Sequence, residues 1–101
     1  MDVREKINAG DYDNKLPYPE KKNFIAGYGP VDEYKEAMKD YRREGNRLME
    51  QFKTDVLEEV GLTGHAKADK IYAKAWEDGR SEGLQVVLLN LEDLAELMLM
   101  L

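Results

Sequence analysis

LQVVLLNLEDLAELMLML, residues 84–101, is the stretch of sequence that decides the fold. Thirteen of its eighteen residues are apolar, and they fall on more than one face of a helix. The stretch is too short and too charged, with Glu92, Asp93 and Glu96, for a membrane span, which needs about 20 apolar residues. A two-helix hairpin covers only one stripe of such a helix. We therefore expect this helix to be buried against another chain.

One stripe of this helix is displaced from the seam that would face a neighbouring helix of the same chain. Leaving its large side chains in water would forgo burial worth about 1.5–3 kcal/mol each. We expect the stripe to form the interface of a homodimer or a larger helical bundle, related by a two-fold axis in the dimer. The predicted oligomer interface consists of Leu84, Leu88, Leu91, Ala95 and Met98.

We expect two long helices, one that precedes this stretch and one that includes it. An apolar heptad seam begins at Tyr34 and predicts a helix over about residues 32–60, which ends at Gly61 with Leu62 folding back as a Schellman cap. Thr63 is the expected N-cap of a second helix over about residues 64–100. On that helix, Gly79 and Gly83 stand four residues apart and permit the close approach of a neighbouring backbone; alternatively, Gly79 marks a kink between two helices.

The first 30 residues differ from the rest in containing all three prolines. Residues 2–9 are compatible with one or two helical turns ended by Gly10, and residues 16–19 must be extended because each proline excludes a helical conformation of the preceding residue. The apolar anchors of this arm either attach it to the helices or grip a partner chain; they are Tyr12, Leu16, Tyr18, Phe24 and Tyr28.

The predicted fold class is therefore all-α. We expect a long two-helix antiparallel hairpin in a domain of residues 31–101, preceded by an irregular Pro- and Tyr-rich arm of residues 1–30. The hairpin is expected to assemble into a helical dimer or higher oligomer.

Composition restricts the classes of function. The 101 residues suffice for one domain, and 21 acidic against 15 basic residues give a net charge of −6, so we expect no direct binding of nucleic acid. The absence of cysteine excludes disulfides and thiol catalysis. We see no signal-peptide pattern at the start and expect a cytoplasmic location.

Catalytic and metal-binding patterns are weak. His65 is the only histidine, and with Asp69 it would supply just two metal ligands. The acidic pairs at residues 58–59 and 92–93 resemble the clusters by which helical nucleotide pyrophosphatases hold magnesium, but the position three residues after the first pair is Leu62, not an acid. We expect no enzyme activity, no metal site and no cofactor; a Mg-dependent nucleotide hydrolase is the weakest alternative.

A small-ligand site is the first alternative to a protein-binding function. Tyr72 and Trp76 lie one helical turn apart beside the Gly79 and Gly83 gap, with Arg80 near them, and could form an aromatic shelf for a nucleotide at an oligomer interface. The same pattern is typical of a core in which Trp76 anchors the hairpin. A sponge-like ligand-binding oligomer therefore stays open beside a purely structural role.

Residues 61–83, GLTGHAKADKIYAKAWEDGRSEG, resemble the central motif of a family of small tailed-phage and prophage accessory proteins. In that family a TGHPKA stretch precedes an AWEHGHSSG stretch and an acidic, leucine-rich C-terminal helix, and YDNKLPYP at residues 12–19 is also similar. This chain departs from the pattern at Ala66, Asp78 and Arg80, where the family often has proline and two histidines. Any metal or acid–base role of those histidines does not carry over.

The resemblance implies a phage-encoded accessory protein. Together with the charge of −6 on the helices, it leads us to expect a non-enzymatic oligomer that binds a host or anti-phage defence protein and inhibits or redirects it. Its acidic surface could imitate the phosphates of nucleic acid. The residues expected to contact a partner or ligand are Tyr72, Trp76, Arg80, Tyr18 and Tyr28.

Overall fold

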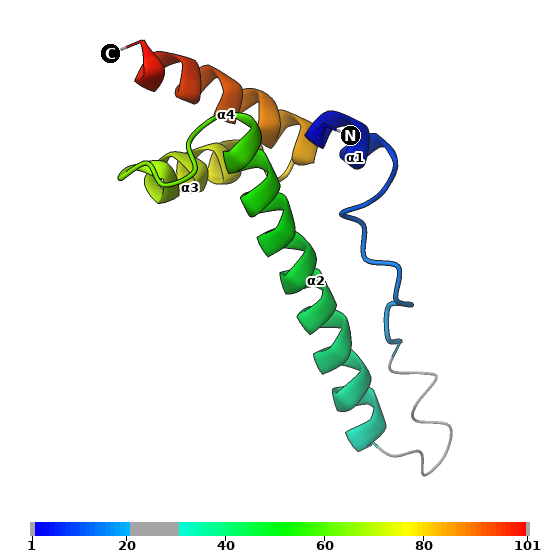
Figure 1. The fold of residues 1–101 in the computed structure, drawn as a ribbon. Helices are drawn as coiled ribbons and strands as arrows, with labels where there is room; N and C mark the ends of the chain where they lie inside the picture. Colours follow the sequence, from blue (N-terminus) through cyan, green and yellow to red (C-terminus); the bar gives the residue numbers. More distant parts are fainter. Residues whose placement is uncertain (1, 21–30, 101) are drawn as a thin grey trace. The chain divides into compact units, whose positions relative to one another are not determined.

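The computed structural model describes residues 2–20 and 31–100 (Figure 1). Within these residues the chain forms four helices and no strand, which confirms the all-α class. Their bounds are α1 Val3–Asn8, α2 Val31–Glu59, α3 Ala68–Gly79 and α4 Leu84–Leu99. No helix of the described part of the chain has the length and apolar character needed to cross a membrane.

The helices belong to two compact units. Unit 1 consists of residues 1–12 and 51–101, and unit 2 of residues 13–50, so that α2 contributes residues to both. The expected boundary at residue 30 is not where the structure divides the chain. The first twelve residues, which we assigned to an irregular arm, are part of the same unit as α3 and α4.

Helix α1 forms at the very start of unit 1. The side chain of Asp2 accepts a hydrogen bond from the backbone N–H of Glu5 at 2.8 Å and so caps the helix. Gly10, with φ of +79°, ends it as expected. Val3, on the inner face of this short helix, is buried. The helical turns anticipated over residues 2–9 are therefore present.

The end of α2 follows the expected Schellman pattern. The N–H of Leu62 donates to the carbonyl oxygen of Leu57 at 2.9 Å, and the N–H of Gly61 donates to that of Glu58 at 3.2 Å. Gly61 has φ of +79°, which a residue without a Cβ adopts at little cost. Leu62 is fully buried by this reversal, as the sequence predicts.

The expected single helix over residues 64–100 is two helices in the structure. Residues 63–67 form turns, in which the Nδ1 atom of His65 accepts a hydrogen bond from the N–H of Lys67, and α3 begins only at Ala68. The chain leaves the helical path after Gly79 and re-enters it at Leu84. Gly79 therefore marks a break between two helices, as the second interpretation predicted.

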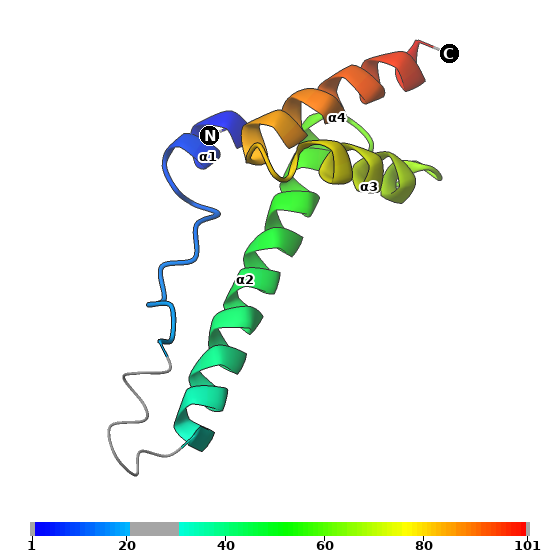
Figure 2. The ribbon, with the colours of Figure 1, turned by 180° about the vertical axis from the view of Figure 1, so that it is seen from behind.

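Gly79 also allows the close backbone approach that its position suggested, but to a helix of the same chain. A Cβ on Gly79 would lie 2.9 Å from the backbone nitrogen of Val87 and 3.1 Å from the carbonyl carbon of Val86. Because α4 starts against this point, it runs beside α3 (Figure 2), and part of the apolar surface of α4 is buried within the chain. Gly83, with φ of +120°, makes the turn that precedes α4.

Phe52 of α2 lies at the centre of unit 1 and is fully buried. The ring of Tyr12 meets it edge-on at 5.2 Å between centroids, and the rings of Tyr72 and Trp76 lie tilted against it, each at 6.5 Å. Around this aromatic cluster, the other fully buried large side chains of the unit are Val56, Leu62, Val87, Leu88 and Leu91.

Unit 2 consists of an extended segment and the first part of α2. The amide of Asn14 donates to the backbone carbonyl of Tyr41 at 2.9 Å, and Tyr18 contacts the ring of Tyr41 edge-on at 5.3 Å. Pro19 is buried. The aromatic residues of the segment thus attach it to α2 in the described range, whereas Phe24 and Tyr28 lie outside the described residues.

We predict that Gly79→Ala lowers the free energy of unfolding by about 1–3 kcal/mol, because the new methyl group overlaps the backbone of α4. Gly45→Ala is the matched control, since its Cβ would meet nothing closer than 3.7 Å, and it should raise stability by about 0.5–1 kcal/mol through helix propensity. Urea unfolding followed by circular dichroism measures both. Equal effects of the two substitutions would contradict the close packing of α3 and α4.

Candidate functional site

The net charge of the chain is located entirely in unit 1. Residues 1–12 and 51–101 contain 13 acidic and seven basic residues, and residues 13–50 contain eight of each. The helix α4 and the residues that follow it carry no lysine or arginine at all. The charged side chains that α4 itself contributes to the surface are therefore all negative, which favours cationic partners.

The exposed face of α4 combines this charge with large apolar side chains. Leu97 is 63% exposed and Met100 is 76% exposed, far more than a core helix usually leaves in water. With Asp93 and Glu96 these two residues line a shallow hollow of about 350 Å³. Leu89, 48% exposed, lies one turn before Asp93. We call Leu89, Asp93, Glu96, Leu97 and Met100 the α4 outer face.

A second depression of about 420 Å³ lies beside this face, between α1, the end of α2 and α4. We call it the acidic groove; its lining consists of Asp2, Arg4, Glu59, Val60, Leu88, Glu92, Ala95, Glu96 and Leu99. Among the described residues that line it, Arg4 is the one cation, and it forms an exposed ion pair with Glu92 at 3.4 Å. The groove therefore offers an apolar floor and a rim on which carboxylates outnumber cations.

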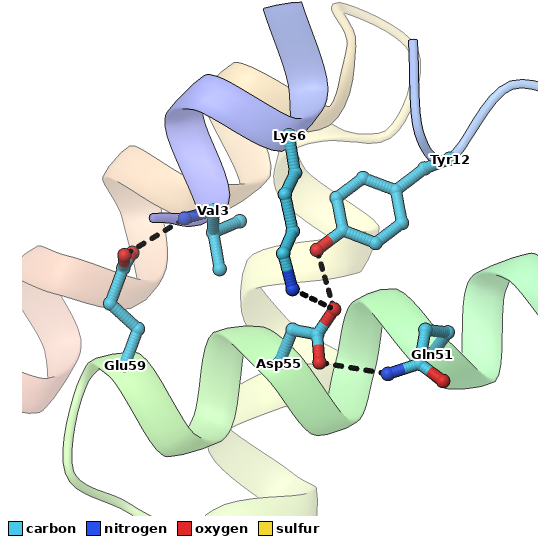
Figure 3. A network of polar contacts seen from close by, with 6 residues as sticks. All are labelled: Val3, Lys6, Tyr12, Gln51, Asp55 and Glu59. Atoms are coloured by element: carbon cyan, nitrogen blue, oxygen red, sulfur yellow. Dashed lines mark hydrogen bonds and ion pairs between the residues drawn. The ribbon is translucent and has the colours of Figure 1, made fainter. Parts of the chain in front are cut away.

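A polar network holds α1 in the position from which it lines the groove (Figure 3). The carboxylate of Asp55 accepts hydrogen bonds from the hydroxyl of Tyr12 at 2.7 Å, from the amide of Gln51 at 2.8 Å and from the ammonium of Lys6 at 3.3 Å. In a neighbouring contact, the N–H of Val3 donates to Glu59 at 2.9 Å.

The network perturbs the acidity of both its central groups. Burial of the Asp55 carboxyl acts to raise its pKa, but the hydrogen bonds from Tyr12, Gln51 and Lys6 outweigh burial and leave the pKa below its ordinary value. Burial, together with the adjacent Asp55 carboxylate, raises the pKa of the Tyr12 hydroxyl far above its usual range. Asp55 is therefore ionised and Tyr12 protonated at neutral pH, as a structural hydrogen bond requires.

Comparison with known proteins gives a family but no activity. The model of a family of unknown function, DUF8546, matches residues 1–99. The chain belongs to this family. No curated protein and no solved structure matches the chain.

The predicted oligomer interface is not an exposed stripe in this DUF8546 member. Leu88, Leu91 and Ala95 are at most 3% exposed and lie in the core of the chain itself, while Leu84 and Met98 are half-buried. The physical reason is the break at Gly79, which lets α3 and α4 cover each other. Burial of these three residues within the chain removes the argument that the stripe needs a second chain, and the oligomer itself stays a prediction.

Two of the residues proposed to contact a ligand, Tyr72 and Trp76, lie together in the aromatic cluster of unit 1. Tyr72 and Trp76 stack on each other at 6.1 Å between centroids, and Lys53 lies over the ring of Tyr72. Both rings are half-buried and pack against Phe52, so their contacts are those of a core cluster. Arg80 is exposed at the turn after α3.

The remaining predicted contact residues lie in the N-terminal segment. Tyr18 is 64% exposed in unit 2, while Tyr28 lies outside the described residues. Among residues 2–20 and 31–100, no group of three or more histidine, aspartate or glutamate side chains is arranged to hold a metal ion.

Sequence reasoning did not single out Leu97 and Met100, the two most exposed large apolar residues at the end of α4. Their one distinguishing signal is the neighbourhood of Asp93 and Glu96 on the same helical face, since acids are rarely placed on a face that becomes fully buried. The Tyr12–Asp55 bond joins residues 43 positions apart and has no local signal.

We predict opposite outcomes for two Leu→Ala substitutions on α4. Leu88→Ala should lower the free energy of unfolding by about 2–5 kcal/mol because it leaves a cavity in the core. Leu97→Ala should change it by no more than about 0.5 kcal/mol because the side chain is exposed. Urea unfolding at two protein concentrations measures both. If the loss of stability caused by Leu88→Ala depended on the protein concentration, Leu88 would instead lie in an interface between chains.

We also predict that Tyr12→Phe lowers the free energy of unfolding by about 1.5–3 kcal/mol, because it removes a hydrogen bond to a carboxylate. The exposed Tyr18 provides the control, and Tyr18→Phe should have almost no effect.

The same network predicts a pH dependence. Because the pKa of Asp55 is lower in the folded chain than in the unfolded chain, its stabilisation is complete above the unfolded value of about 4 and is lost as the pH falls through the folded value. The thermal midpoint of the unmodified chain should therefore fall more steeply below pH 4 than that of Asp55→Asn. Parallel midpoint curves would show that Asp55 contributes nothing.

Proposed function

We propose that this protein is a non-enzymatic phage accessory protein that binds a host or anti-phage defence protein and inhibits or redirects it. The observation that carries the proposal is the α4 outer face, where Leu97 and Met100 stand in solvent beside Asp93 and Glu96. Apolar patches of this kind on small proteins mark contact surfaces. The resemblance of residues 61–83 to phage accessory proteins is the reason for proposing a host or defence protein as the partner.

The chemistry of the face indicates the kind of partner that fits it. Large aliphatic side chains at the centre of a contact supply affinity by burial, and the flanking carboxylates select cations. Since no lysine or arginine of α4 neutralises Asp93 and Glu96, we infer a partner surface that carries lysine or arginine around an apolar anchor. Proteins that bind nucleic acid carry such cationic surfaces, and the net charge of unit 1 suits competition for them.

A second copy of the chain fits the same face less well. Two-fold pairing brings the same patch of both copies together, so Asp93 and Glu96 of one copy would lie near those of the other. Like charges brought together while water is excluded weaken association. Self-association through the α4 outer face is therefore the competing outcome that the experiment must separate from binding of a basic partner.

The proposal is tested by site-specific photocrosslinking in host cells, with and without infection. A photoreactive phenylalanine analogue replaces Leu97 in one variant and Glu77, an exposed residue of α3, in the control. We expect a discrete adduct with one host or defence protein from position 97 and none from position 77. Adding Glu96→Lys to the first variant should weaken that adduct at least about fivefold, because it removes a carboxylate that attracts the partner.

Three results would contradict the proposal. An adduct of the chain with itself would assign the face to a second copy. The same adducts from positions 77 and 97 would show non-specific collision, and the absence of any adduct from position 97 would leave the α4 outer face without a partner.

A further inference from the structure

Four basic side chains in the first part of α2, within unit 2, lie toward one side of the helix. Lys35, Lys39, Arg42 and Arg43 repeat at spacings of three and four residues and so share one side, which we call the basic stripe. All four side chains are exposed, and together with Tyr34, Met38 and Asn46 they line a shallow hollow of about 600 Å³. Glu36, Asp40 and Glu44 follow a separate row four residues apart.

The stripe brings like charges together, and of the acids three residues before Lys35, Lys39 and Arg43, which are Asp32, Glu36 and Asp40, only Asp40 forms an ion pair in the described part of the chain. Lys39 stands four residues from both Lys35 and Arg43, and three from Arg42, so that like charges meet along the stripe. Within the part of the chain that the structure describes, Arg43 pairs with Asp40 at 3.4 Å, whereas Lys35, Lys39 and Arg42 form no ion pair. A ligand with regularly repeated negative charge would relieve this repulsion.

The stripe has the chemistry of a phosphate contact surface and not of a protein contact surface. Protein interfaces have an apolar centre from which charged residues are depleted, whereas nucleic-acid interfaces are polar and strongly positive. None of the exposed large apolar side chains of the described residues lies on the stripe. Arg42 and Arg43 add guanidinium groups, whose planar arrangement of donors matches phosphate oxygens.

We propose that the basic stripe binds the phosphate backbone of duplex DNA without reading its sequence. Duplex is favoured over single strands, because proteins that bind single strands stack bases on exposed aromatic rings, and the one ring at the stripe, Tyr34, is half-buried. The net charge of −6 does not oppose this, since it belongs to unit 1 while unit 2 has equal numbers of acids and bases. At 0.1 M salt, charges act over about 10 Å, so a local surface decides the contact.

This inference goes beyond the proposed function and is independent of the α4 outer face. The basic stripe lies in unit 2 and the α4 outer face in unit 1. A chain that has both surfaces suits a target protein that is itself bound to DNA, with the protein and the DNA engaged by different helices.

Binding of a labelled 20-base-pair DNA duplex, followed by fluorescence anisotropy over a series of salt concentrations, tests the inference. We expect the logarithm of the association constant to fall with the logarithm of the salt concentration with a slope of about −3, since each phosphate contact contributes about −0.9. Lys39→Gln should reduce that slope by about one. The triple variant Lys35→Gln, Lys39→Gln, Arg42→Gln should bind at least about tenfold more weakly at low salt, a loss that the removal of three phosphate contacts accounts for.

The matched control is Lys15→Gln, Lys67→Gln, Lys70→Gln, which changes the net charge by the same three units at exposed positions outside the stripe. It should retain most of the binding. Because glutamine is a good helix former, both triple variants should keep the helical circular dichroism of the unmodified chain.

The inference would be overturned if the unmodified chain did not bind the duplex at about 20–50 mM salt, where phosphate contacts are strong. It would also be overturned if both triple variants bound equally weakly, or if the chain bound a single strand more tightly than the duplex. Preference for duplex RNA over DNA would also contradict it. Displacement of the duplex by polyglutamate at equal charge concentration would assign the stripe to an acidic protein.

Discussion

Phe52 is the side chain on which the arrangement of unit 1 depends. It is fully buried and contacts Tyr12 from the N-terminal segment and Tyr72 and Trp76 from α3. Aromatic pairs in edge-on and tilted geometry add about 0.5–1.5 kcal/mol each beyond the burial of their area. Segments distant in the sequence are thus joined at one ring. The hydroxyl of Tyr12 reaches Asp55 on the next turn of α2, so the same residue adds a directional bond to an apolar contact.

Local signals predicted local structure correctly. The Schellman reversal at Gly61, the Asp2 cap of α1 and its end at Gly10 each depend on residues within a few positions of one another, and each is present. The break after Gly79 was left undecided by the sequence, because a glycine in a helical pattern is compatible with a tight helix contact and with a helix end. In the structure Gly79 is both a helix end and a point of close contact with α4. This arrangement depends on the packing of α4 on α3, which local sequence does not reveal.

That one undecided point changed the inferred interaction surface. With a continuous helix, Leu88 and Leu91 would need a second chain; with the break, they lie in the core, and the apolar side chains left in solvent are those of the last turns, such as Leu97 and Met100. Charge shows the same limit of sequence reasoning. A net value of −6 averages over surfaces, whereas the structure places the excess in unit 1 and leaves Lys35, Lys39 and Arg42 together on one side of α2. Periodicity along α2 contained this information, but the composition did not.

In the proposed function, the acids of the α4 outer face restrict which partners its exposed leucine and methionine can bind. Buried against an identical face, Leu97 and Met100 would gain apolar contact, but Asp93 and Glu96 of both copies would lose water and face each other. The carboxylates therefore weaken pairing of this face with an identical face and favour its binding to a cationic surface. In the proposed function, specificity is the difference in binding free energy between a cationic partner and an identical chain. The apolar side chains would contribute affinity for either partner, and the acids would favour the cationic one.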